Sequence, residues 1–105
     1  MVKRIWHGWT APENADAYEA LLESEIFPGI REKNIPGYRG ISLLRRDAQD
    51  EVAFVTIMSF ESVDSARIIS GDDSSSAYVP ESARALLSRW DDRSEIYEVR
   101  QEQQY

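Results

Sequence analysis

The stretch from Tyr38 to Phe60 constrains the fold of this chain more than any other part of the sequence. It holds two runs rich in apolar residues, 38–46 and 51–60, with the short connection 47–50 between them. Two such runs separated by a few turn residues predict an antiparallel hairpin. The second run has apolar side chains on both faces, which is typical of a strand that is covered twice. Because a chain of 105 residues seldom has enough material to cover both faces of its sheet, the hairpin indicates a partner subunit.

Length and composition predict a single domain over residues 1–105. Hydrophobic residues make up 42% of the chain and charged residues 30%, as in folded rather than disordered proteins. The longest uncharged apolar stretch, 52–60, is far shorter than the roughly 20 residues that cross a bilayer, so we expect no membrane partner. The first residues lack the apolar run of a secretory signal, and the absence of cysteine fits a reducing compartment. We therefore expect a cytoplasmic protein.

The charge balance and the scarcity of metal-ligand residue types exclude further classes. The formal net charge of −7 makes nucleic acid an unexpected partner, because the surface as a whole repels phosphate backbones. One histidine, no cysteine and scattered carboxylates do not supply the convergent ligands of a metal site. We expect neither a metal nor another cofactor.

Before the hairpin, the sequence predicts a strand and a helix. Side chains alternate with period two over 3–10. Thr10 and Glu13 have the spacing of a capping box, with a proline in the first helical turn between them. Pro28 must kink or end this helix, because it lacks the amide that bonds back one turn. The turn-rich segment 33–37 then leads into the hairpin.

After the hairpin, Ser62 is placed to cap a second helix that ends near Gly71. The polar segment 72–76 is expected to be a solvated loop, with a lid over a site as the alternative. A third helical segment is predicted over 81–89 and a last strand over 95–100.

The resulting order β-α-β-β-α-β predicts an α+β, ferredoxin-like fold: a four-stranded antiparallel sheet with its helices on one face. The opposite face would expose a larger apolar patch than soluble monomers usually show. Two copies that stack these faces would bury the patch and enclose a pocket. We therefore expect a homodimer that forms through the open face of the sheet.

Five stretches spread over nearly the whole chain resemble a known family. They are Gly8-Trp9-Thr10, Ala11-Pro12-Glu13-Asn14-Ala15, Ile35-Pro36-Gly37-Tyr38-Arg39-Gly40, Phe54-Val55-Thr56-Ile57-Met58 and Trp90-Asp91. In these stretches the chain is similar to the antibiotic biosynthesis monooxygenase family of dimeric α/β barrels, and most of all to bacterial members without an assigned activity. The resemblance implies a pocket between helices and sheet. Members of the family use it to oxygenate phenolic compounds without metal or flavin, or to break down haem.

His7 is the candidate catalytic residue, because it is the single histidine of the chain and histidine suits proton transfer at neutral pH. It shares a strand face with Ile5 and Trp9. It is a candidate general base toward a phenol or hydroquinone. The alternative is a packing or interface histidine satisfied by one hydrogen bond. Haem-degrading relatives carry their ligand histidine on a helix. His7 is expected on a strand, so the role of haem ligand is not transferred to it.

Aromatic side chains and one arginine are the candidate substrate-binding groups. The rings could sandwich a planar substrate, and core or dimer-interface packing is the alternative. The candidate rings are those of Trp9, Tyr18, Tyr38, Phe54 and Trp90. Arg39 could bind a carboxylate or enolate, and its alternative is an ion pair with an acidic residue at the surface.

Two functions follow. The first is a small-molecule-binding dimeric barrel that acts as a cofactor-independent monooxygenase on small aromatic or polyketide-like compounds. The second is a non-catalytic ligand-binding or structural homodimer, whose interior is filled by side chains. The sequence leaves open whether the protein is an enzyme.

Overall fold

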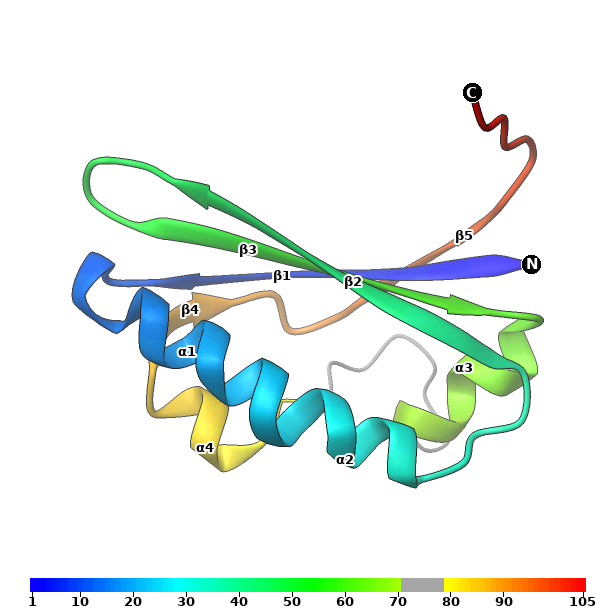
Figure 1. Cartoon of the computed structure of the whole chain (residues 1–105), viewed down its shortest axis with the longest axis horizontal. Helices are drawn as coiled ribbons and strands as arrows, with labels where there is room; N and C mark the ends of the chain where they lie inside the picture. The colour runs from blue at the N-terminus through cyan, green and yellow to red at the C-terminus, as the bar shows by residue number, and fades with distance from the viewer. Residues whose placement is uncertain (71–78) are drawn as a thin grey trace.

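The chain folds into an antiparallel sheet with helices on one of its faces, and the computed structural model describes residues 1–70 and 79–105. The strands are β1 (Val2–Thr10), β2 (Tyr38–Asp47), β3 (Val52–Phe60), β4 (Leu87–Trp90) and β5 (Glu95–Glu98). The helical elements are η1 (Pro12–Asn14), α1 (Ala15–Leu21), η2 (Leu22–Ile26), α2 (Phe27–Glu32), α3 (Val63–Ser70) and α4 (Glu81–Arg84). Figure 1 shows these helices gathered below the sheet. The class is α+β, as expected, and the arrangement is compatible with a ferredoxin-like fold.

The first strand, β1, is the centre of the sheet. It pairs with β3 along its whole length on one side, from Val2 opposite Phe60 to Thr10 opposite Val52. On its other side, β4 pairs with the end of β1 and β5 pairs with its beginning. The predicted hairpin is confirmed, because β2 and β3 are antiparallel neighbours and β2 forms the outer edge. The sheet has five strands rather than the four predicted, because two short strands share one edge of β1.

The helix predicted over 81–89 is wrong in its second half. The helix α4 ends at Arg84, and Leu87–Trp90 forms the strand β4. Leu87 pairs with Thr10, and Trp90 pairs with Gly8. The end of β1 would have an unpaired edge without these residues, so sheet pairing overrides a weak local preference for helix.

The predicted capping box at Thr10 is also wrong. Thr10 is the last residue of β1, it is fully buried, and its Oγ1 has no hydrogen-bond partner among the described residues. The cap position of the first helical turn belongs to Ala11. The second predicted cap is confirmed, since the amide of Ser65 donates to Oγ of Ser62 at 3.3 Å. Gly71 and the proposed loop or lid at 72–76 lie outside the described residues.

The elements from η1 to α2 form one continuous helical rod, which Figure 1 shows along the lower edge of the molecule. The interruption expected at Pro28 takes the form of the π-helical turn η2 just before it, and the helix continues to Glu32. The amide of Phe27 donates to the carbonyl of Leu22, five residues back. Such π-turns occur frequently at functional sites.

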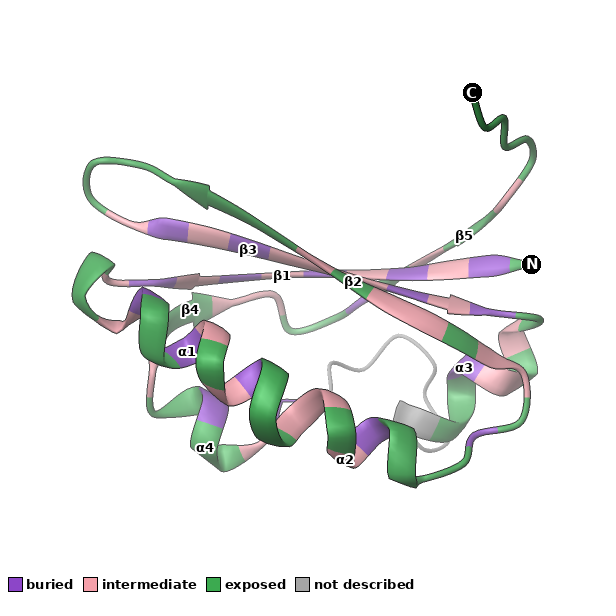
Figure 2. Ribbon diagram, in the orientation of Figure 1, coloured by how far each residue is buried: buried purple, intermediate pink, exposed green. Residues whose placement is uncertain are grey.

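Side chains of β1 alternate strictly between the two faces of the sheet. Val2, Arg4, Trp6, Gly8 and Thr10 point toward the helices and are buried, whereas the residues between them are half-buried. Figure 2 shows the same alternation along the β1 ribbon. The predicted division of this strand into two faces is therefore confirmed.

The second face of the sheet carries no helix in the part of the chain that the structure describes. The centre of this open face is formed by half-buried apolar side chains of β1 and β3, including Ile5, Val55 and Ile57. Leu44 and Tyr97 lie toward its sides and are 47% and 52% exposed. None of the described helices is long and apolar enough to cross a membrane.

Candidate functional site

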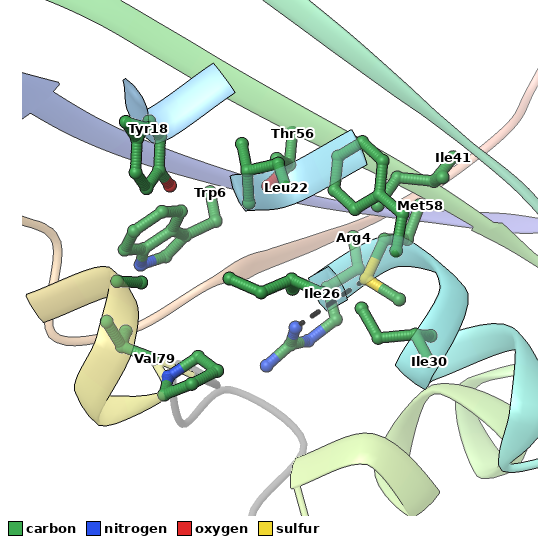
Figure 3. Close-up of a pocket in the computed structure, with 13 residues that line it drawn as sticks. Arg4, Trp6, Tyr18, Leu22, Ile26, Ile30, Ile41, Thr56, Met58 and Val79 are labelled. Carbon is green, nitrogen blue, oxygen red and sulfur yellow. Dashed lines mark hydrogen bonds between the residues drawn. The ribbon is translucent and has the colours of Figure 1, made fainter. Parts of the chain in front are cut away.

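A small cavity lies between the sheet and the helical rod, and Figure 3 shows the side chains around it. Its walls are aromatic and aliphatic, and they come from β1, β2, β3, the rod and the segment before α4. They include Trp6, Tyr18, Leu22, Ile26, Ile30, Ile41, Met58 and Val79. The cavity volume is ≈ 40 Å³. This is room for water, and far below the roughly 300 Å³ at which small-molecule pockets begin.

One charged side chain, that of Arg4, lines this cavity. Arg4 is only 4% exposed, and Figure 3 shows its guanidinium turned into the space between the sheet and the rod. Its Nη1 lies 4.0 Å from Sδ of Met58. Desolvation by burial lowers the pKa of Arg4 to about 10. A charge is costly to bury unless it is paired, and Arg4 is not without an interaction partner.

Arg4 was missed by the sequence reasoning. The signal was present in the alternation of β1, because a positive charge occupies a position on the same face as Trp6 and Thr10. The pattern identifies the face of a side chain, but it does not say that a helix will cover that position.

Three of the predicted site residues do gather on the helix side of the sheet. Tyr18 lines the cavity and meets the ring of Phe54 edge to face, with ring centroids 4.8 Å apart and an interplanar angle of 71°. Burial raises the pKa of the Tyr18 hydroxyl. This phenol therefore stays neutral at physiological pH and keeps its proton as a hydrogen-bond donor. Trp90 packs against the same core cluster.

His7 and Trp9 lie on the open face of the sheet, away from the cavity. The Nδ1 of His7 is 3.2 Å from Oδ2 of Asp91, and the His7 ring lies nearly parallel to that of Trp9, with centroids 6.1 Å apart. A carboxylate that orients an imidazole through Nδ1 is the usual arrangement of a general base. The sequence reasoning did not find Asp91 as the partner of His7.

An arginine also contacts the Trp9 ring. The guanidinium of Arg89 lies 3.7 Å from the ring centroid, which is close enough for a cation–π contact. Both oxygens of Glu51 accept hydrogen bonds from Arg89, at 2.7 and 3.3 Å. These bonds lower the pKa of the Glu51 carboxyl. The two rings of β1 on the open face are therefore contacted by Asp91, just after β4, and by Arg89 of β4, which Glu51 holds in turn.

The last two predicted residues, Tyr38 and Arg39, lie at a third place. They line a surface groove of ≈ 530 Å³ between the rod and the start of β2. The Tyr38 ring packs on Phe60 with centroids 5.3 Å apart, and burial raises the pKa of the Tyr38 hydroxyl. Arg39 forms an ion pair with Glu61, as the alternative interpretation of this arginine expected.

The predicted residues thus occupy the cavity, the open face and the groove, and no single site brings them together. The described residues contain no cluster of three or more side chains suited to a metal ion. The chain matches no protein-family model, no curated protein and no solved structure. Fold and cavity alone define its class, an α+β protein that holds a buried cation in an apolar cavity.

Proposed function

We propose that this protein is a small-molecule-binding homodimer of the antibiotic biosynthesis monooxygenase type, with a ferredoxin-like protomer. The ligand is a small aromatic or polyketide-like compound that binds as an anion. One observation carries the proposal: the buried guanidinium of Arg4 turned into a cavity walled by Trp6 and Tyr18.

The cation accounts for the kind of ligand. A phenol or an enolisable ketone beside a desolvated guanidinium ionises more easily, because the opposite charge stabilises the phenolate or enolate. The apolar walls lower the local polarity and strengthen this interaction. An electron-rich anion of this kind is the species that reacts with oxygen in the absence of a metal. Arg4 would supply the electrostatic part of such a monooxygenase, and Tyr18 a neutral hydroxyl.

The homodimer is supported by the apolar character of the open face. Apolar side chains such as Ile5, Val55 and Leu44 form a continuous patch on neighbouring strands, and soluble proteins usually cover such patches. Stacking of two open faces by a twofold axis would bury the patch on both copies. In that assembly His7 would lie at the interface rather than in the ligand cavity.

A non-catalytic homodimer remains the second candidate function, and the small cavity favours it. A space of ≈ 40 Å³ holds no aromatic ligand unless side chains of the rod move. Leu22 and Ile26, at the two ends of the π-helical turn, line the cavity and are the side chains of the rod that would have to move.

The deciding experiment measures the binding of phenols and enolisable ketones to the wild-type protein and to Arg4→Met by calorimetry. Loss of binding in Arg4→Met, with binding retained in Arg46→Met as the matched control, is the expected result. Arg46 is an exposed arginine of β2 that does not line the cavity. Oxygen uptake by the wild-type protein with a bound ligand then separates enzyme from binding protein. Equal binding by both variants would remove Arg4 from the site.

A further inference from the structure

The open face of the sheet carries opposite charges at its two borders. On β2, Arg46 lies opposite Ala53, which in turn lies opposite Trp9, so Arg46 is on the open face. At the other border, Asp91 follows β4, and Glu95 of β5 pairs with β1 on the same face. Because these borders are opposite edges of the sheet, a twofold axis along the strands stacks the basic border of one copy on the acidic border of the other. The charges therefore favour a second copy of the chain as the partner that covers this face.

His7 lies between the apolar centre of the open face and its acidic border. Its Nδ1 is 3.2 Å from Oδ2 of Asp91, and each of the two side chains is 44% exposed. The neighbours of His7 on β1 and β3 are apolar, namely Ile5, Trp9 and Val55. The pair of His7 and Asp91 is thus accessible to solvent in the protomer, and a second copy on the open face would take much of this exposure away.

The ionisable side chains around His7 come from β4, β5, the turn between them and the connection of the hairpin. They are Glu51, Arg89, Asp91, Asp92, Arg93 and Glu95. Glu51 accepts two hydrogen bonds from Arg89, and these bonds lower the pKa of the Glu51 carboxyl, so both groups stay charged at neutral pH. With Arg46 of the partner subunit added, the set holds four carboxylates and three arginines. A neutral His7 leaves one negative charge unbalanced, and a protonated His7 balances it.

We propose that His7 and Asp91 make the homodimer pH-dependent, so that the two copies bind more tightly when His7 is protonated. The inference rests on the proposed function, because the stacking of two open faces is what buries the pair. Histidine changes its charge between about pH 5 and pH 8, and His7 is the single histidine of the chain. With a neutral imidazole the interface buries an unbalanced carboxylate, which is costly, whereas the imidazolium forms an ion pair with Asp91. Acidification therefore stabilises the dimer, in contrast to interfaces in which protonated histidines repel each other.

The dissociation constant of the dimer at pH 8 and at pH 6, measured by sedimentation of a dilution series, tests this inference. We expect the wild-type dimer to bind at least about ten-fold more tightly at pH 6. His7→Asn keeps a polar side chain that does not titrate, and its dissociation constant should be the same at both pH values within about a factor of two. Asp91→Asn should reverse the trend, because protonation of His7 then leaves a positive charge unbalanced. Asp64→Asn removes a carboxylate from α3, which Figure 1 shows on the helix side, and this control should follow the wild-type protein.

The outcomes separate this inference from the homodimer of the proposed function. A mass equal to one chain at both pH values overturns the homodimer and the inference with it. A dimer whose dissociation constant is the same at both pH values, or larger at pH 6, overturns the inference alone. The inference also fails if His7→Asn keeps the wild-type pH dependence or if Asp91→Asn follows the wild-type trend. If dilution does not dissociate the dimer, exchange of subunits between two fluorescently labelled preparations gives its dissociation rate, which should fall by the same factor at pH 6.

Discussion

Arg4 and His7 lie three positions apart on β1, and their side chains leave the strand on opposite faces of the sheet. Arg4 points toward the helices and lines the cavity, whereas His7 points to the open face and contacts Asp91. A ligand in the cavity is separated from the imidazole by the backbone of the central strand. The one histidine and the one buried cation of the described residues therefore cannot act on the same bound molecule within one protomer.

The first prediction concerns His7. His7→Ala should leave the affinity for phenols unchanged within a factor of two, since the imidazole does not reach the cavity, whereas Arg4→Met should weaken it at least ten-fold. Calorimetric titration of both variants with the same ligand measures the difference. A His7→Ala protein that is a dimer, yet no longer binds, would show that the open face carries the ligand.

The second prediction concerns the effect of Arg4 on the stability of the folded protein at alkaline pH. Burial lowers the pKa of Arg4 to about 10 in the folded state, so between that pH and its higher unfolded value the unfolded chain binds more protons. The cost of burying the charge is thus fully present below pH 10 and decreases above it. Relative to Arg4→Met, the free energy of unfolding of the wild-type protein should rise by about 1 kcal/mol between pH 9 and pH 11. Urea titrations of both proteins at pH 9 and pH 11 measure the free energies of unfolding. A difference between the two proteins that stays the same at both pH values would contradict the prediction.

The third prediction compares two glycines. A Cβ at Gly8 would lie 2.9 Å from Cη2 of Trp6 and 3.1 Å from Cδ2 of Leu87, whereas a Cβ at Gly40 would meet nothing within 4 Å. Gly8→Ala should therefore cost about 1–3 kcal/mol of stability, as overpacking usually does. Gly40→Ala should change stability by less than about 0.5 kcal/mol. Thermal and chemical unfolding of both variants provide the test. Equal losses of stability would mean that the Trp6 side chain moves to accommodate the added methyl group without cost.

The fourth prediction concerns the dimer. Val55 lies near the middle of the open face, opposite His7 on one neighbouring strand and Leu44 on the other. Val55→Glu places a charge in the proposed interface and should convert the dimer into a monomer. Ala17→Glu, at an exposed position of α1, is the control and should remain dimeric. Light scattering at micromolar concentration gives both masses. A wild-type mass equal to one chain would overturn the dimer itself.

The parts of the fold that depend on local pattern were predictable from the sequence. The hairpin and the two faces of β1 follow from a period-two alternation, which fixes side-chain direction whatever the surroundings are. Residues 87–89 were assigned to a helix because the strand conformation of β4 depends on pairing with β1, more than seventy residues earlier in the chain. The predicted capping box at Thr10 is wrong for the same reason, because Thr10 pairs with Val52 as the last residue of β1.

The candidate site was less predictable, because its residues were chosen for their side-chain chemistry, which does not indicate how deeply each residue is buried. Tyr18 and Phe54, two of the candidate rings, lie in contact on the helix side of the sheet. His7 and Trp9 were grouped with them, although an odd position on β1 places both on the other face. Arg4 escaped notice because only the path of the helical rod over the sheet makes an arginine at that position a buried one.

The central position of β1 also sets the order in which this protein can fold. Val2 pairs with Phe60 on one side and with Glu98 on the other, so both neighbours of β1 come from later in the chain. During synthesis β1 emerges before the other four described strands, and one of its edges stays unpaired until β4 and β5 have left the ribosome. Contacts between such distant segments slow folding, because a long loop must close before any of them forms. The nascent chain is therefore most exposed to aggregation through the same strand that carries Arg4 and His7.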